Sequence, residues 1–173
     1  MKIIIKGALA ALLLAGAASP ALAQATDTES GSGSVTIFQP ITVTKNADLK
    51  FGNIVRPSSG TGSATVSTAG ARSTVNAVGL ASGDAPQAAQ FTVDGEGGQL
   101  FTLAVPASFS VTSGANSILV TTSQDVLNGT QTLGGSLGSP GSKVVNIGGS
   151  IPVDDTTASG AYLGSFNVTA TYN

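Results

Sequence analysis

The sequence predicts an all-β domain, an antiparallel sandwich of the immunoglobulin type. Three observations indicate this fold. β-Branched residues are frequent and charged residues make up only 9% of the chain, a composition that suits half-buried strands. Short stretches of alternating apolar and polar residues recur about ten residues apart, and no helix-period segment follows the N-terminal stretch. Clusters rich in Gly, Ser, Asn and Asp separate these stretches, as turns do in a sandwich.

The first 23 residues have the layout of a secretory signal peptide. Two lysines within the first six residues precede an apolar run over residues 7–18, and the small-residue site Ala21-Leu22-Ala23 follows. This layout predicts cleavage after Ala23, with Gln24 as the mature N-terminus, and export from the cytoplasm. The apolar run is shorter than the roughly 20 residues that span a bilayer. No second such run follows, so we expect no integral membrane span after cleavage.

The mature chain begins with a polar stretch, and its ordered part begins at Val35. Residues 24–34 are rich in Gly and Ser, which predicts a flexible leader before a single sandwich domain over residues 35–173. Val35, Ile37, Ile41 and Val43 share one parity, so residues 35–43 are expected to form a first strand with one apolar face. Proline has no N–H to donate, so Pro40 places this strand at a sheet edge or breaks it in two.

Further strands are predicted by the same alternation. They are expected near Leu49 and Phe51 and at residues 64–68, 73–80, 90–93, 100–105, 108–112, 117–122, 144–148 and 162–172. In the last stretch, apolar or small residues occupy every second position from Tyr162 to Tyr172, and only Asn173 follows. We therefore expect no later strand to cover the edge of this one, which leaves open what pairs with it.

Parity within these strands also predicts the hydrophobic core. Side chains two residues apart point to the same face of a strand, and core packing is the expected role of every Phe. The expected core residues are Phe91, Val93, Phe101, Leu103, Val105, Phe109, Val111, Ile118, Val120, Phe166 and Val168.

The residue inventory leaves little material for catalysis. The chain has no His, no Cys and no Trp, so Ser-His-Asp and Cys-His arrangements and the usual zinc sites are ruled out. After removal of the signal segment, five scattered basic residues face nine acidic ones, which argues against nucleic acid as a partner. We therefore expect a non-enzymatic protein without a cofactor.

Two acidic pairs could offer oxygen ligands to Ca²⁺. They are Asp94 with Glu96, and Asp154 with Asp155. Short Asp/Glu clusters next to turn formers are more often solvated turns, which is the interpretation adopted here, with calcium left as the alternative. A sugar-cleaving role for these carboxylates is disfavoured because aromatic stacking platforms are scarce.

Several phrases of the sequence resemble a known family. PITVTKNADLKFGNIV, AAQFTVDGEGG and GAYLGSFNVTATYN resemble the domain of unknown function 4402 family over nearly all of the mature chain. More distantly, the Leu49-x-Phe51-Gly52-x-Ile54 pattern, together with the terminal Gly160-x-Tyr162 strand, is similar to pilins and spore-coat-U-like subunits of chaperone-usher systems. That similarity implies a sandwich that lacks its last strand. In those relatives, a neighbouring subunit's N-terminal segment fills the groove, after a periplasmic chaperone has held it open.

The resemblance leads to one expected function and one alternative. We expect a structural subunit of a bacterial surface fibre or adhesive appendage, exported to the periplasm and assembled as a homo-polymer by β-strand complementation, with a chaperone and an outer-membrane usher as partners. The alternative is a monomeric secreted binding module, for example one for carbohydrate. Whether the first strand pairs within or between molecules is left open. The expected interface residues are Val35, Ile37, Ile41 and Val43 on the donor side, and Tyr162, Phe166, Val168 and Tyr172 on the acceptor side.

Overall fold

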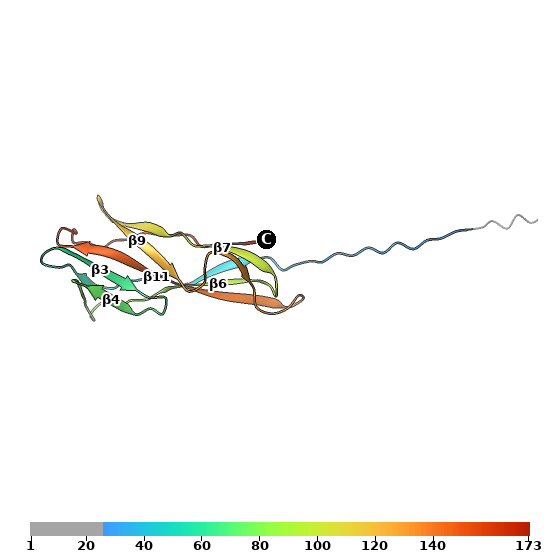
Figure 1. Cartoon of the computed structure of the whole chain (residues 1–173), viewed down its shortest axis with the longest axis horizontal. Helices are drawn as coiled ribbons and strands as arrows, with labels where there is room; N and C mark the ends of the chain where they lie inside the picture. Colours follow the sequence, from blue (N-terminus) through green and yellow to red (C-terminus); the bar gives the residue numbers. More distant parts are fainter. Residues whose placement is uncertain (1–25) are drawn as a thin grey trace, which may run out of the picture. The chain divides into compact units, whose positions relative to one another are not determined.

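Twelve strands and no helix are found in the computed structural model, which describes residues 26–173 (Figure 1). The expected signal segment, residues 1–23, lies outside the described residues. Residues 36–173 form one compact unit, and within residues 26–173 no helix is long and apolar enough to cross a membrane. The strands are β1 (Thr42–Ala47), β2 (Ile54–Val55), β3 (Thr61–Val66), β4 (Arg72–Val75), β5 (Val78–Gly79), β6 (Ala89–Glu96), β7 (Leu100–Ala104), β8 (Ser108–Ser113), β9 (Asn116–Gln124), β10 (Gly129–Thr132), β11 (Pro140–Asp154) and β12 (Thr169–Tyr172).

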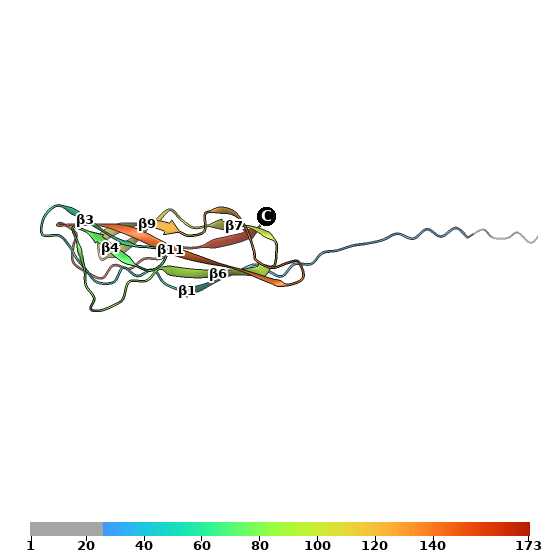
Figure 2. The same cartoon turned by 60° about the horizontal axis from the view of Figure 1, so that its bottom comes forward.

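All strand pairs are antiparallel. The large sheet has the order β1-β6-β11-β3-β4, and β9 joins it by pairing with both β11 and β8. A smaller sheet has the order β10-β7-β12, and β2 pairs with β5 in a separate ribbon. Figure 2 shows β1 beside β6 at one edge of the large sheet. The expected all-β antiparallel sandwich is thus confirmed, with β1 and β12 as edge strands of the two sheets.

The 15-residue strand β11 is the central element of the large sheet. It pairs with β6 from Pro140 to Ile147 and with β3 from Gly149 to Asp154, and Figure 1 shows it running through the middle of the domain between these two strands. Gly148 lies at the change of partner, where a Cβ atom would collide with the Val66 carbonyl oxygen. Only glycine allows the backbones to approach so closely, which explains this residue at the crossing.

The core consists of two clusters of buried side chains. The first contains Ala89, Phe91, Val93, Phe101, Leu103, Val105, Leu133, Val145 and Ile147. The second is smaller, with Ala64, Val120, Ile151 and Val153. The Phe166 ring lies 5.9 Å from that of Phe91 and 4.8 Å from that of Phe109, so it bridges the first cluster to a side chain packed against the second. The period-two alternation therefore predicted the core of β6 and β7 correctly.

The structure corrects the expected first and last strands. The first strand was expected at residues 35–43, but β1 begins at Thr42 and residues 36–41 lie outside any strand. Pro40 lacks the N–H that would continue the ladder, so pairing starts after it. The last strand was expected over residues 162–172, yet only residues 169–172 form β12. Alternation produces an apolar face, but a strand also needs a second strand to pair with. Residues 164–168 have no such ladder partner.

Candidate functional site

A large apolar groove opens between two extended segments of the chain. It has a volume of about 1140 Å³, and its floor is formed by the β8, β9 and β11 side chains Phe109, Val111, Ile118, Ile151 and Val153. One wall is the segment of residues 48–56, which follows β1. The other wall is the segment of residues 157–166, which precedes β12. We call this site the edge groove, because it separates the segments that adjoin the two edge strands.

Arg72 helps to hold the first wall, together with the Lys50–Gln87 bridge and the β2–β5 pair. Leu49 and Phe51 turn apolar side chains toward the second core cluster. The Arg72 guanidinium donates hydrogen bonds to the carbonyl oxygens of Phe51 (2.8 Å), Asn53 (3.1 Å) and Leu80 (2.7 Å). A planar guanidinium carries several donors in a rigid fork, so one side chain can hold three carbonyls in place. Arg72 could not be predicted as a residue of this wall, because nothing in the neighbouring sequence marks it.

The second wall is attached to β8 at one point. Leu163 and Thr112 exchange two backbone hydrogen bonds of 2.8 and 3.0 Å. Next to them Gly164 lies against β8 so closely that a Cβ atom would collide with the Ser110 carbonyl oxygen. The glycine therefore permits the close approach that forms this wall. At one end of the groove, Arg56 Nη1 donates a hydrogen bond of 2.6 Å to the Thr157 carbonyl oxygen and joins the two walls.

Neither wall is a continuous strand. Apart from the bridges at Lys50 and Leu163 and the short β2, residues 48–56 and 157–166 belong to no ladder. Extended backbone that lies mostly outside a ladder, beside an apolar floor, is a template for another strand. The groove can therefore receive an extended peptide, which would pair its backbone with a wall and place alternate side chains on the floor.

The rim of the groove carries charges of both signs. Lys45 and Asp48 form an exposed ion pair of 2.7 Å, and Lys50 and Asp84 form a longer one of 3.7 Å. The hydrogen bond from the Lys45 ammonium, with its positive charge, holds the pKa of Asp48 below its ordinary value. Exposed pairs of this kind contribute little to stability, so the rim is a solvated border around the apolar floor.

The predicted donor residues fall into two groups. Val35 and Ile37 are 81% and 82% exposed. In contrast, Ile41 and Val43 pack against the first core cluster of their own domain, and Val43 pairs with Val93. The stretch after Pro40 therefore folds as part of its own sandwich, and of the four predicted donor residues only Val35 and Ile37 remain exposed.

The predicted acceptor residues are divided in the same way. Tyr162 and Phe166 line the edge groove, and the Tyr162 hydroxyl donates a 2.9 Å hydrogen bond to the Ala158 carbonyl oxygen. Val168 and Tyr172 do not line the groove; they pack against the first core cluster, Val168 just before β12 and Tyr172 within it. The alternation predicts one strand for all four residues, but only Tyr172 lies in a strand, because the stretch before β12 is unpaired.

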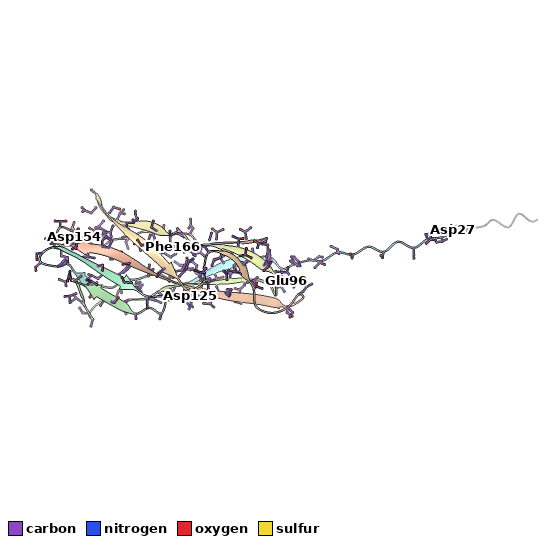
Figure 3. All side chains as sticks on the ribbon, in the orientation of Figure 1. Asp27, Glu96, Asp125, Asp154 and Phe166 are labelled. Atoms are coloured by element: carbon purple, nitrogen blue, oxygen red, sulfur yellow. The ribbon has the colours of Figure 1, made fainter. Side chains whose placement is uncertain are left out.

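The acidic residues considered for calcium are not gathered in one place. Within the described part of the chain, no group of three or more His, Cys, Asp or Glu side chains lies together, and Figure 3 places Glu96 and Asp154 at opposite ends of the domain. Hydrogen bonds from the Thr157 and Thr156 hydroxyls lower the pKa of Asp154. Glu96 was expected in a solvated turn, but it is buried, because its carboxylate is bound by backbone amides.

Comparisons with known proteins give one match. A family model described as "Domain of unknown function (DUF4402)" matches residues 41–172, which is most of the chain. No curated protein and no solved structure matches the chain. The more distant similarity to chaperone-usher subunits stays a prediction.

Proposed function

Since the chain belongs to the DUF4402 family of domains of unknown function, we propose a function from the geometry of the edge groove. The protein is a non-enzymatic structural subunit of a bacterial surface fibre or adhesive appendage, and its groove receives a β-strand from a second copy. One observation carries the proposal: an apolar groove of about 1140 Å³ lies between two extended segments that are largely unpaired. Such a site suits β-strand addition.

The stretch from Val35 to Ile37 supplies the apolar side chains of the strand. It is uncharged, and its two exposed aliphatic side chains, Val35 and Ile37, are spaced to point to the same face of a strand. Burying both would contribute about 3–6 kcal/mol, at roughly 1.5–3 kcal/mol each. New backbone hydrogen bonds would add about 0.5–1.5 kcal/mol each. Apolar burial and the new backbone hydrogen bonds would together favour the association of two subunits.

The direction of β1 favours a second copy over the chain's own groove. Lys45 and Ala47, near the end of β1, line the groove, so the residues before Thr42 leave the strand at its other end. To reach the groove of its own chain, the segment before Thr42 would have to turn back and run along all six residues of β1, a distance of about 20 Å. Residues 35–40 span only about 20 Å when fully extended, so none would remain to enter the groove.

A contact between this segment and the groove of another copy joins two different surfaces. Such a head-to-tail contact leaves one free segment and one free groove at the ends of each assembly. When the same contact repeats without closing a ring, the subunits form a filament. The signal-peptide layout of residues 1–23 supports export before assembly. A periplasmic chaperone that covers the apolar floor, and an outer-membrane usher, are the partners that this assembly route calls for.

The test compares two substitutions at exposed apolar residues. Ile37→Arg introduces a charge where an apolar floor is expected, whereas Leu127→Arg makes the same change at a residue that is 75% exposed and does not line the groove. Purified mature protein should form concentration-dependent polymers in size-exclusion chromatography with light scattering. Ile37→Arg should remain monomeric with an unchanged melting temperature, and Leu127→Arg should polymerise like the wild type.

A peptide of residues 31–40 provides the second half of the test. It should bind monomeric Ile37→Arg subunits and raise their melting temperature, because a ligand that binds only the folded state stabilises it. A wild-type protein that stays monomeric at all concentrations, and that does not bind the peptide, would overturn the proposal.

A second candidate function rests on a row of amide side chains on the large sheet. Asn46 Nδ2 donates to Gln90 Oε1 (3.3 Å), Gln90 Nε2 to Asn146 Oδ1 (2.9 Å), and Asn146 Nδ2 to Asp125 Oδ2 (2.7 Å). Gln90 and Asn146 also line a shallow hollow of about 340 Å³. Convergent amides suit a polar ligand such as a carbohydrate, which would favour a monomeric binding module. Glycan binding that is lost in Asn146→Ala, without any polymer, would select this function.

A further inference from the structure

The end of the domain that carries Glu96 in Figure 3 is closed by a cluster of contacts on Tyr172. The Tyr172 hydroxyl donates to the Gln39 carbonyl oxygen (2.9 Å) and accepts from the Glu96 backbone N–H (2.6 Å). The Phe38 ring lies with its centroid 6.2 Å from that of Tyr172. We call these residues, together with Gly138, the Tyr172 clasp.

The carboxylate of Glu96 completes the clasp. Its Oε2 atom accepts a hydrogen bond of 3.2 Å from the Gln39 N–H, and its Oε1 atom accepts one from the Gly138 N–H. Glu96 is 2% exposed and is the one charged residue buried in the described part of the chain. A buried carboxylate is costly unless donors surround it. The backbone of Gln39 is therefore bound through both its N–H and its C=O.

Glycine at position 95 makes room for this arrangement. A Cβ atom there would collide with the Tyr172 hydroxyl, so only glycine lets the phenol reach Gln39 across the strand. The clasp thus depends on contributions from the segment before β1, the end of β6, the loop before β11, and β12. Four separate parts of the chain therefore meet in the clasp.

We propose that the Tyr172 clasp divides the N-terminal segment between Ile37 and Phe38, into a part that is free to enter a partner and a part that is fixed to its own domain. Ile37 is 82% exposed, whereas its neighbour Phe38, held by the clasp, is 45% exposed. The partner that takes the free part is the second copy of the proposed function, on which this inference rests. Phe38 is withheld from that partner, and Gln39 is the fixed point from which the donor strand leaves.

Chymotrypsin cleavage after Phe38 measures whether the clasp is closed. In the free wild-type subunit, kept dilute and monomeric, this bond should be protected relative to a peptide of residues 33–44. Tyr172→Phe retains the ring but removes the hydroxyl, and Glu96→Gln removes the charge at nearly unchanged size. Each should speed cleavage after Phe38 about tenfold, because each weakens one hydrogen bond that holds the Gln39 backbone, and one lost hydrogen bond is worth up to about that factor.

The chain offers a matched control in its other tyrosine. Tyr162→Phe removes a hydroxyl that bonds to a carbonyl oxygen in the groove wall, and it should leave the Phe38 cleavage rate unchanged. Cleavage after the fully buried Phe101 reports global unfolding and should stay slow in every variant. Equal rates after Phe38 in the wild type, Tyr172→Phe and Glu96→Gln would overturn the clasp, as would a wild-type rate equal to that of the peptide.

This result is independent of polymer formation. Unprotected Phe38 in a protein that still polymerises removes the clasp and leaves the proposed function. Protected Phe38 in a protein that never polymerises removes the proposed function and leaves the clasp as a structural joint.

Discussion

The chain has two regions where the edges of its two sheets face each other, and they differ in how those edges are completed. At the closed region, β1 pairs with β6 and β12 pairs with β7, and side chains from both edges pack over the first core cluster. At the open region, the segments that continue these edges are mostly unpaired and flank the edge groove. Both regions have apolar residues at alternate positions. What the open region lacks is a neighbouring strand, so an apolar face alone does not complete a sandwich.

The largest expected difference between the two regions is the cost of removing a phenyl ring. Phe101→Ala in the closed region should lower the free energy of unfolding by about 3–5 kcal/mol, because it leaves a cavity in packed surroundings. Phe109→Ala in the open region should cost only about 1–2 kcal/mol, because this half-buried ring already borders the groove. Urea denaturation of monomeric protein measures both values. Equal costs would contradict the distinction between a closed and an open region.

A smaller effect is expected from Gly164, which brings one groove wall against β8. Gly164→Ala should lower the free energy of unfolding by about 1–3 kcal/mol, because the new methyl group would collide with the Ser110 carbonyl oxygen. It should also weaken binding of the residue 31–40 peptide. At Gly134 the nearest atom to a new Cβ would be at 3.4 Å, so Gly134→Ala should be neutral or slightly stabilising. Isothermal calorimetry and thermal melting separate the two effects; a Gly164→Ala protein with normal peptide affinity would argue against the position of this wall.

In the opposite wall, Arg72→Lys should lower the free energy of unfolding by about 1–2 kcal/mol. Arg72→Lys replaces the guanidinium that bonds three carbonyl oxygens with a point charge that cannot hold all three. Peptide affinity should fall together with stability. Arg56→Lys loses only one such bond, so its effect should be smaller. If the two variants behave alike in urea denaturation and peptide titration, Arg72 does not fix the wall.

The smallest expected effect concerns Asp154, at the end of β11. Thr157 and Thr156 stabilise its ionised form and lower its pKa. A lowered pKa in the folded state contributes stability above the ordinary value, near pH 4, and this contribution is lost as the pH falls through the folded value. Thr157→Val should raise the pKa of Asp154, and Thr157→Ser should preserve it. NMR titration of the carboxyl carbon measures both; an unchanged pKa in Thr157→Val would exclude the hydroxyl as the cause.

The fold could be predicted from local pattern, whereas the groove could not. Parity in β6 and β7 identified Phe91, Val93, Phe101 and Leu103 as core residues, because both strands have partners. The same rule failed before β12, since alternation says which face is apolar and not whether a neighbour exists. The spacing of Leu49 and Phe51 predicts a strand, but their role in a groove wall depends on Arg72, which lies in another hairpin. Glu96 was expected to be exposed, because sequence does not show that distant backbone amides surround its carboxylate.

The long strand β11 has a mechanical consequence for a fibre built from such subunits. Tension would enter a subunit through the segment before β1 and leave through the groove walls. Between these points lies β11, whose single uninterrupted backbone is bonded to β6 in one half and to β3 in the other. Antiparallel ladder bonds lie perpendicular to the strands, so a pull along the strands loads many of them at once in shear. Resistance to such a pull is a matter of unfolding rate, not of equilibrium stability.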